Sequence, residues 1–141
     1  MREIKFRAWD INNKKMFRVD RIDYRDDNFE IREVRRATEY PINVADQMYY
    51  DLLEIELMQF TGLTDKNGCE IYEGDILRLL NSEVLCEVIY DAPSFCRRWI
   101  SPKVSSLRGV EMESMAHNTH IAYEVIGNIY QHKHLLKENE K

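Results

Sequence analysis

The feature that most constrains this fold is a series of short segments in which apolar and polar residues alternate, separated by turn residues about every ten positions. In the first segment Ile4, Phe6 and Ala8 alternate with charged neighbours, and Asn12-Asn13-Lys14 supplies turn residues behind them. Apolar residues return directly afterwards, so residues 3–20 are predicted to form a hairpin. The pattern as a whole favours small coiled sheets or a small barrel.

Further strands and one helix are predicted along the rest of the chain. The strands are expected at about 29–34, 54–60, 76–80, 84–90, 95–100 and 121–130. The best helix candidate is residues 44–53, where Asn43 can act as the N-cap and apolar residues recur at near-helical spacing. Met58 and Phe60 fall out of phase with Ile55, which indicates a bulge or a fully buried stretch. The tail from His132 is expected to form a short helical turn.

Residues 61–75, TGLTDKNGCEIYEGD, hold three of the five glycines of the chain and form its most strongly patterned segment. Asn67-Gly68 predicts a tight turn because both residues accept a positive φ. Gly74-Asp75 predicts a turn into a strand, in which the carboxylate accepts hydrogen bonds from nearby backbone amides. We interpret the acidic residues of this segment as turn-stabilising and solvated; a general acid–base pair is the alternative.

Composition restricts the classes of partner. Lys and Arg total 20 against 25 Asp and Glu, which gives a net charge of −5 and argues against coating of duplex DNA. No window approaches the length of about 20 apolar residues that a membrane span needs. The N-terminal MREIKFRAWD is charged and alternating, without the apolar run of a signal peptide. A cytoplasmic protein without membrane contact is therefore expected.

The sequence contains no recognisable catalytic, cofactor or metal motif. Cys69, Cys86 and Cys96 match no CxxC pattern, and free thiols are the expected state, with Cys86 on a buried strand. The four histidines, at 117, 120, 132 and 134, have no cysteine pair to complete a zinc site. No GxSxG, HExxH or phosphate-binding glycine loop occurs. We expect no catalytic residues, no cofactor and no metal, and thus a protein that is not an enzyme.

Three segments resemble the YopX family of phage and prophage proteins. They are MREIKFRAWD, the central LMQFTGLTDKNGCEIYEGDIL at 57–77, and YEVIGNIYQHKHLL at 123–136. The residues of this structural motif are Gly62, Asp65, Asn67, Gly68, Tyr72, Gly74, Asp75, Gly127 and Asn128. Cys69 and His132-Lys133-His134 depart from the residues usual in the family.

The resemblance implies a single domain over residues 1–141, built from several coiled β-sheets that include an SH3-like barrel. We place the barrel at about 70–131, beside the hairpin at 3–20. The segments 20–54 and 92–120 are those in which such proteins vary. The family has no established biochemical activity, and its shared residues are mostly glycines, turn residues and apolar anchors, which nominate no reactive group.

Two binding functions and one enzymatic function are compatible with these residues. The favoured hypothesis is a non-enzymatic accessory protein that binds an unknown host or phage protein, for which eight tyrosines and two tryptophans offer interface material. The alternative is binding of single-stranded nucleic acid through a surface formed by Arg97, Arg98 and Trp99, with Arg32, Arg35 and Arg36 as a second basic cluster. An enzyme, hydrolytic or thiol-based, is the third hypothesis.

A homo-oligomer is also expected. Segments around Met16–Val19 and Phe95–Ile100 are predicted to be sheet edges that lack the lysines and prolines protecting lone edges. They carry aromatic residues, Phe17 and Trp99, of the kind enriched at interfaces.

Overall fold

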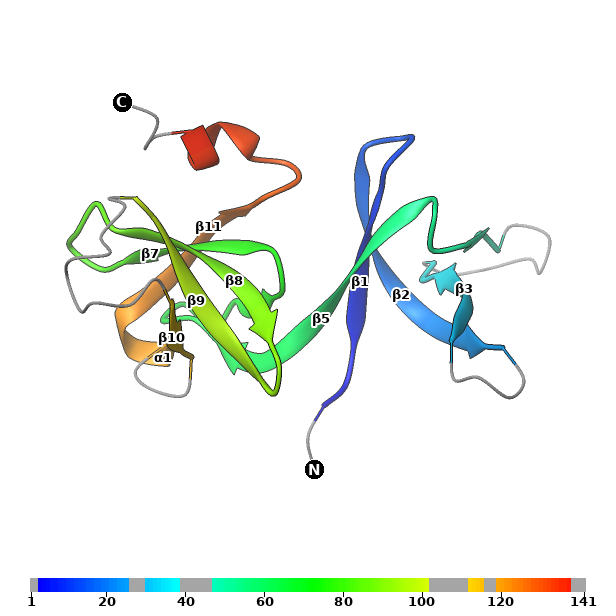
Figure 1. Ribbon diagram of the computed structural model, residues 1–141, viewed down its shortest axis with the longest axis horizontal. Helices are drawn as coiled ribbons and strands as arrows, with labels where there is room; N and C mark the ends of the chain where they lie inside the picture. The colour runs from blue at the N-terminus through cyan, green and yellow to red at the C-terminus, as the bar shows by residue number, and fades with distance from the viewer. Residues whose placement is uncertain (1–2, 26–29, 39–46, 102–111, 116–118, 138–141) are drawn as a thin grey trace. The chain divides into compact units, whose positions relative to one another are not determined.

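The computed structural model describes residues 3–25, 30–38, 47–101, 112–115 and 119–137 (Figure 1). Within these residues the chain is mainly β, with two antiparallel sheets and little helix, which confirms the predicted class. The strands are β1 (Phe6–Asp10), β2 (Lys15–Tyr24), β3 (Ile31–Arg36), β4 (Tyr49–Tyr50), β5 (Ile55–Thr64), β6 (Glu70–Tyr72), β7 (Asp75–Leu79), β8 (Leu85–Asp91), β9 (Ser94–Ser101), β10 (Met112–Ser114) and β11 (Tyr123–Asn128). The helices are α1 (Thr119–Ala122) and the 3-10 helix η2 (Lys133–Lys137).

The chain divides into two compact units, Glu3–Gln59 and Phe60–Lys141. In the first unit the strands follow the order β4-β3-β2-β1-β5. The predicted hairpin is present as β1 and β2, with Ala8 opposite Phe17. Alternate residues of these strands point to one face, where a buried core forms from Ala8, Phe17, Val34, Tyr50 and Ile55.

The pairing of β5 explains why its apolar residues, from Ile55 to Phe60, do not follow one regular alternation. Its first half pairs with β1, and Ile55 lies in the core of the first unit. Its second half pairs with β6 in the second unit, where Phe60 lies opposite Tyr72 with ring centroids 5.5 Å apart. The β5–β6 register shifts between Phe60 and Thr64, and Gly62 has a φ of 86° there. This shift follows Phe60, whereas β5 pairs with β1 without a shift from Ile55 to Gln59. Of the two predicted alternatives, burial therefore accounts for Met58 and Phe60, which are both buried, and no bulge lies at these two residues.

The second unit contains a five-stranded sheet in the order β10-β9-β8-β7-β11. Its core includes Ile71, Leu77, Cys86, Val88 and Tyr123, and Cys86 is fully buried as predicted. A second cluster forms from Ile76, Leu85 and Ile100, against which Leu135 and Leu136 of η2 pack. Among the described strands β10 and β11 are the two ends of an open sheet, and no ladder closes them into a barrel.

The helix predicted at 44–53 is wrong over its described part. Residues 47–53 form an extended approach, β4 and a turn, while 44–46 lie outside the described residues. Tyr50 is held in the first core by its stack against Phe17, with ring centroids 4.8 Å apart. Tertiary pairing of β4 with β3 thus overrides a local spacing that resembles a helix.

The segments predicted as sheet edges are interior. Met16–Val19 belongs to β2, which lies between β3 and β1, and Phe95–Ile100 belongs to β9, which lies between β10 and β8. Phe17 is only 6% exposed because it faces the core. The argument for self-association from these two edges therefore fails, and the outer strands are β4 and β6 of one sheet and β10 and β11 of the other.

Candidate protein-interaction surface

Asp65 organises the turn between β5 and β6. Its side chain is 3% exposed, and its Oδ1 accepts hydrogen bonds from the backbone N–H groups of Asn67 and Cys69 at 2.8 and 2.9 Å. Its Oδ2 accepts from the N–H of Val125 in β11 at 2.9 Å. Gly68 has the positive φ, 82°, that this turn requires. One carboxylate therefore closes a turn and fastens it to a distant strand.

Gly74 and Asp75 connect β6 to β7. Gly74 has a φ of 84°, its N–H donates to Val88 at 2.8 Å, and its carbonyl accepts from Ile129 at 2.8 Å. The buried Asp75 carboxylate accepts from the N–H of Tyr72 at 2.8 Å. These contacts match the turn predicted from Gly74-Asp75, in which the carboxylate serves backbone amides.

Asn128 forms the corresponding turn after β11. Its Oδ1 accepts from the N–H groups of Tyr130 and Gln131 at 3.1 and 2.9 Å, and its own N–H donates to Nδ1 of His132 at 3.1 Å. Gly127 lies so close to the His132 ring that an added Cβ would come within 2.6 Å of Nδ1. The motif residues thus stabilise turns, and Asp65 and Asp75 both use their carboxylates on backbone amides.

The described residues hold no group of three or more His, Cys, Asp or Glu side chains placed to bind a metal ion. Cys69, Cys86 and Cys96 are free thiols. In the described part of the chain, no helix has the length and apolar character needed to cross a bilayer.

A further buried carboxylate, Asp10, was not among the predicted site residues. It accepts hydrogen bonds from the N–H groups of Asn12 and Asn13 at 3.0 and 2.9 Å, and from the side-chain amide of Asn13 at 2.9 Å. The backbone bond from Asn13, followed by the bond from its side chain, holds the pKa of Asp10 below its ordinary value. The signal in the sequence is an aspartate directly before the asparagine-rich turn.

Replacement of Asp10 by Asn is expected to lower the free energy of unfolding by about 1 kcal/mol at neutral pH, because an amide has one acceptor oxygen for three donors. A lowered folded pKa contributes stability above the unfolded pKa of about 3.9, and this contribution is lost as pH falls through the folded pKa. The difference between wild type and variant should therefore shrink below about pH 4 in urea unfolding curves. Asp91→Asn, at an exposed carboxylate, is the matched control. A difference that grows in acid would contradict the assignment.

The structure does not bring Arg97, Arg98 and Trp99 together on one surface. Successive residues of β9 point to opposite faces of the sheet. Arg97 is 3% exposed, donates to Thr119 Oγ1 and lies over the Tyr123 ring at 4.3 Å from its centroid. Trp99 is half-buried against the same core, and Arg98 pairs with Glu87 at 2.9 Å. Because residues 95–100 were already predicted to form a strand, this separation was foreseeable from the sequence.

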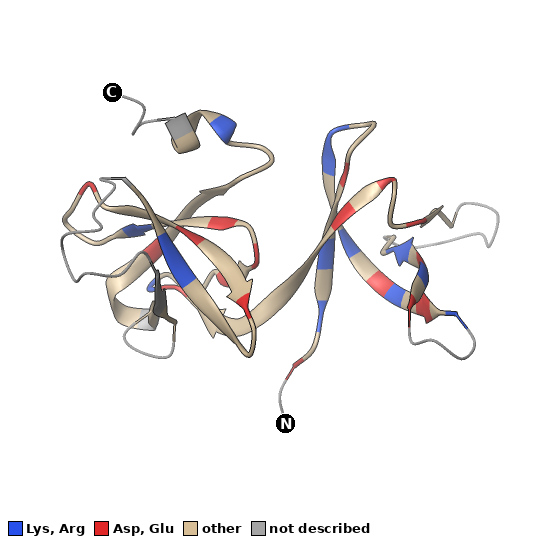
Figure 2. Cartoon of the chain, in the orientation of Figure 1, with Lys and Arg blue, Asp and Glu red and all other residues tan. Residues whose placement is uncertain are grey.

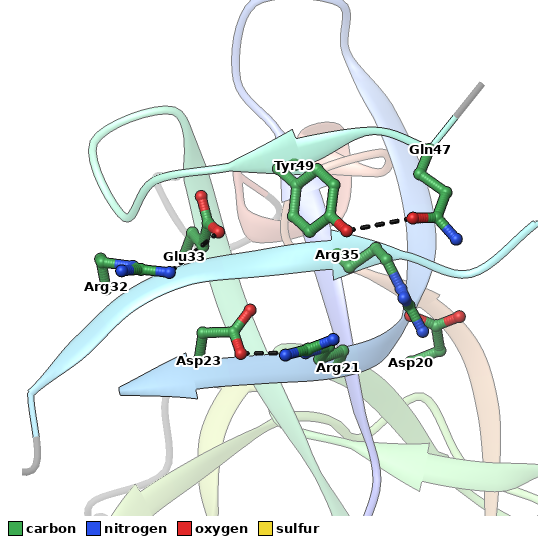
Figure 3. Close-up of polar contacts among 8 residues, drawn as sticks. All are labelled: Asp20, Arg21, Asp23, Arg32, Glu33, Arg35, Gln47 and Tyr49. Atoms are coloured by element: carbon green, nitrogen blue, oxygen red, sulfur yellow. Dashed lines mark hydrogen bonds and ion pairs between the residues drawn. The ribbon is translucent and has the colours of Figure 1, made fainter. Parts of the chain in front are cut away.

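The basic cluster at Arg32, Arg35 and Arg36 is also divided. Arg35 donates to Asp20 at 2.8 Å, which raises the pKa of the guanidinium, and Arg32 approaches Glu33 at 3.5 Å. Figure 3 shows these pairs together with a pair inside β2, in which Arg21 Nε and Asp23 Oδ1 are 2.9 Å apart. Basic and acidic residues follow one another closely along β2 (Figure 2). Three arginines of β2 and β3, Arg21, Arg32 and Arg35, are thus paired with carboxylates.

Two grooves open on the first unit near the ends of β3. One, which we call the Leu53 groove, has a volume of about 530 Å³ and is lined by Arg25, Glu30, Ile31, Arg32, Asp51, Leu52 and Leu53. The other, which we call the arginine groove, has a volume of about 490 Å³ and is lined by Met16, Phe17, Arg18, Arg36, Ala37, Thr38 and Met48.

A turn at Asp51 builds the Leu53 groove. Asp51 Oδ1 accepts the N–H of Leu53 at 2.8 Å, and its carbonyl accepts the N–H of Glu54 at 3.1 Å, so the chain leaves β4 after two residues. This turn leaves Leu53 91% exposed and Leu52 43% exposed beside Ile31. Sequence reasoning missed the site because it placed Leu52 and Leu53 in the helix predicted at 44–53.

Comparison with known proteins places this fold. A family model described as "YopX protein" matches residues 5–137. The chain belongs to the YopX family. The crystal structure of protein EF1440 from Enterococcus faecalis is similar to this YopX-family chain with a TM-score of 0.60 and 27% identity, over 96% of this chain and 99% of that one. That of protein yopX from Bacillus subtilis is similar with a TM-score of 0.63 and 20% identity over the same shares. A search of the curated proteins found no match.

The segment expected to vary in YopX-family proteins, residues 20–54, supplies most of both grooves. It provides the entire lining of the Leu53 groove and four lining residues of the arginine groove, Arg36, Ala37, Thr38 and Met48. The residues of the predicted structural motif lie elsewhere, at the turns described above and in β5, β6 and β11. The residues that stabilise the turns of the fold are therefore different from the residues that line the two grooves.

Proposed function

We propose that this YopX-family chain is a non-enzymatic protein-binding module, an accessory protein of phage or prophage that acts in the bacterial cytoplasm. The observation that carries the proposal is the exposure of Leu53 beside Leu52 and Ile31 in one groove. Burial of an exposed leucine side chain contributes about 2 kcal/mol, so a partner that covers this groove gains substantially.

The surroundings of the Leu53 groove support a protein partner. Arg25, Glu30, Arg32 and Asp51 line it together with the apolar residues. An apolar centre with a charged rim is typical of protein interfaces, in which a few central side chains supply most of the binding energy. The partner is a host or phage protein, and a second copy of this chain can occupy the groove in its absence.

We propose further that the second unit is an SH3-like barrel, as expected for about 70–131. Its strands β7, β8, β9 and β10 follow one another as an antiparallel meander, and β11 returns through α1 to pair with β7. This strand order supports the proposal, and an experimental structure that includes the residues between β9 and β11 tests it.

Binding of single-stranded nucleic acid is the competing proposal. It needs basic groups free to contact phosphate and aromatic faces free to stack on bases. Arg21, Arg35 and Arg98 are each held by a carboxylate, and Arg97 is buried. These observations favour the protein-binding proposal.

Leu53→Glu tests the proposed function, because it places a charge in the centre of the groove. We expect wild type to exceed the monomer mass of 16.9 kDa in light scattering at tens of micromolar, and the variant to be monomeric. In affinity capture from cells that carry the phage, wild type should retain a protein that Leu53→Glu loses. The melting temperature of the variant should change little, since Leu53 is 91% exposed.

Ile4→Glu is the matched control, since Ile4 is also an exposed apolar residue of the first unit but lines neither groove. Capture that is equal for wild type and Leu53→Glu would reject the groove as the docking surface. A nuclease-sensitive complex in place of a protein would favour the nucleic-acid proposal.

A further inference from the structure

The outer strands of the two sheets differ in how far their free edges are already occupied. At β11 the N–H of Val125 donates to Asp65, and the carbonyl of Tyr123 accepts from the N–H of Lys66 at 3.1 Å. A turn of the same chain therefore covers that edge. Strand β4 is the last strand of its sheet, and within the described residues no strand or turn pairs with its outer side. Unpaired N–H and C=O groups at a sheet edge are a template for another strand.

The register of β4 shows which of its backbone groups face outward. The N–H of Arg36 donates to the carbonyl of Met48 at 2.9 Å. Val34 lies opposite Tyr50. Successive residues of an antiparallel strand direct their N–H and C=O groups alternately toward the neighbouring strand and away from it. Tyr49, between Met48 and Tyr50, therefore directs both groups to the free edge, where neither has a hydrogen-bond partner in the described part of the chain.

The side chains along this edge are apolar and exposed. Four of them within residues 48–53 are between 43% and 91% exposed: Met48, Tyr49, Leu52 and Leu53. Edges that resist pairing carry lysine, proline or inward-pointing charges. Residues 47–51 contain neither lysine nor proline, and their one charged residue is Asp51. The edge therefore offers apolar surface to an added strand and has little that opposes it.

The strand is also ordered before any partner arrives. The Tyr50 ring stacks on Phe17, with ring centroids 4.8 Å apart, which anchors β4 to the core of the first unit. The hydroxyl of Tyr49 donates to Oε1 of Gln47 at 3.0 Å (Figure 3). An edge that is already extended and held in place lowers the entropic cost of binding.

We propose that β4 pairs with β4 of a second copy of this chain, antiparallel about a two-fold axis, with Tyr49 opposite Tyr49 of the partner subunit. A residue that exposes one donor and one acceptor is self-complementary, because two copies exchange two hydrogen bonds and satisfy all four groups. In this register Gln47 lies opposite Asp51 of the partner subunit, so like charges do not meet. This self-complementarity favours a second copy over a strand of another protein.

The proposal deepens the proposed function and rests on it, since it states how a second copy that occupies the Leu53 groove is held. Leu52 and Leu53 follow β4 directly, so in the antiparallel pair they flank the joined strands at both ends. Two short strands with these leucines form a small interface. We therefore expect a dimer that dissociates in the micromolar range.

Tyr49→Pro tests the pairing, because it removes the outward N–H and no hydrogen bond of the sheet itself. Proline is tolerated on an edge strand whose N–H faces solvent, so the circular dichroism spectrum should be unchanged. In sedimentation velocity the dissociation constant of the dimer should rise about thirtyfold, as expected for loss of two backbone hydrogen bonds. Tyr49→Ala, which removes the side chain but keeps the N–H, is the matched control and should stay within about fivefold of wild type.

Cross-linking tests the register even if Tyr49→Pro lowers the stability of the fold. The background is Cys69→Ser, which removes the exposed native thiol. Opposite residues of a hydrogen-bonded antiparallel pair have Cα atoms about 5.5 Å apart, within the range of a disulfide, so oxidation of Tyr49→Cys by diamide should give a covalent dimer. Gln47→Cys is the control, because the two-fold register separates its two copies by about 14 Å.

Three results would overturn the proposal. They are a wild type that is monomeric at every concentration, a Tyr49→Pro protein that folds and dimerises like Tyr49→Ala, and cross-linking of Gln47→Cys equal to that of Tyr49→Cys. Capture of another protein that Tyr49→Pro loses, while wild type alone is monomeric, would assign the edge to a strand of that protein and reject self-pairing.

The proposed function fails separately from the pairing of β4. If Leu53→Glu loses a captured protein while wild type alone is monomeric, the protein-binding function stands and self-pairing is rejected. If Tyr49→Cys cross-links and Tyr49→Pro dissociates the dimer, while Leu53→Glu captures the same proteins as wild type, the pairing of β4 stands and the Leu53 groove is rejected as the docking surface.

Discussion

Asp65→Ala is expected to lower the free energy of unfolding by about 3 kcal/mol, because three backbone N–H groups lose the two carboxylate oxygens that accept from them. The N–H groups of Asn67 and Cys69 lie on an exposed turn and can reach water, so most of the loss comes from the half-buried Val125. Urea unfolding followed by tryptophan fluorescence measures the change.

Two substitutions separate this explanation from a general sensitivity of the turn. Asp65→Asn keeps one acceptor oxygen and should cost about half as much. Lys66→Ala, at the exposed neighbouring side chain, should remain within about 0.5 kcal/mol of wild type. An Asp65→Ala protein of unchanged stability that loses its partner would show that the segment is a binding loop and not a structural one.

The elements that the sequence predicts well are those determined by neighbouring residues. Turn residues such as Asn67-Gly68 and Gly74-Asp75 impose backbone conformations locally, and the strands between them follow from alternation. The helix at 44–53 could not be excluded in this way, because the feature that decides it is distant. Tyr50 stacks on Phe17, a residue of another strand, and β4 pairs with β3. Long-range contacts of this kind leave no periodic signal.

The candidate surface is harder to predict than the fold for the same reason. Arginines that are adjacent in the sequence at 35 and 36 have opposite surroundings, since one pairs with Asp20 and the other lies over Phe17. Arg97, predicted at a surface, is buried over Tyr123, which comes from β11. The residue type shows that a side chain is charged. Whether that side chain can contact a ligand depends on the contacts it makes with the neighbouring strand.

Gly127→Ala is expected to lower the free energy of unfolding by about 2 kcal/mol through crowding, because the new Cβ would lie 2.6 Å from Nδ1 of His132. His132→Ala alone should cost about 1 kcal/mol, because the N–H of Asn128 loses its acceptor. In the double variant the clash is absent, so the combined loss should fall short of the sum by about 1 kcal/mol or more.

Gly68→Ala is the control for this comparison of single and double variants. Its positive φ of 82° predicts a cost of about 1 kcal/mol from backbone strain, but the space around it is open and it is not near His132. Its effect should therefore add to that of His132→Ala. Additive losses for Gly127→Ala and His132→Ala would contradict the close packing of β11 on the His132 ring. A shortfall only at Gly127 would show that His132 holds the turn after β11 and the start of η2 against the second core.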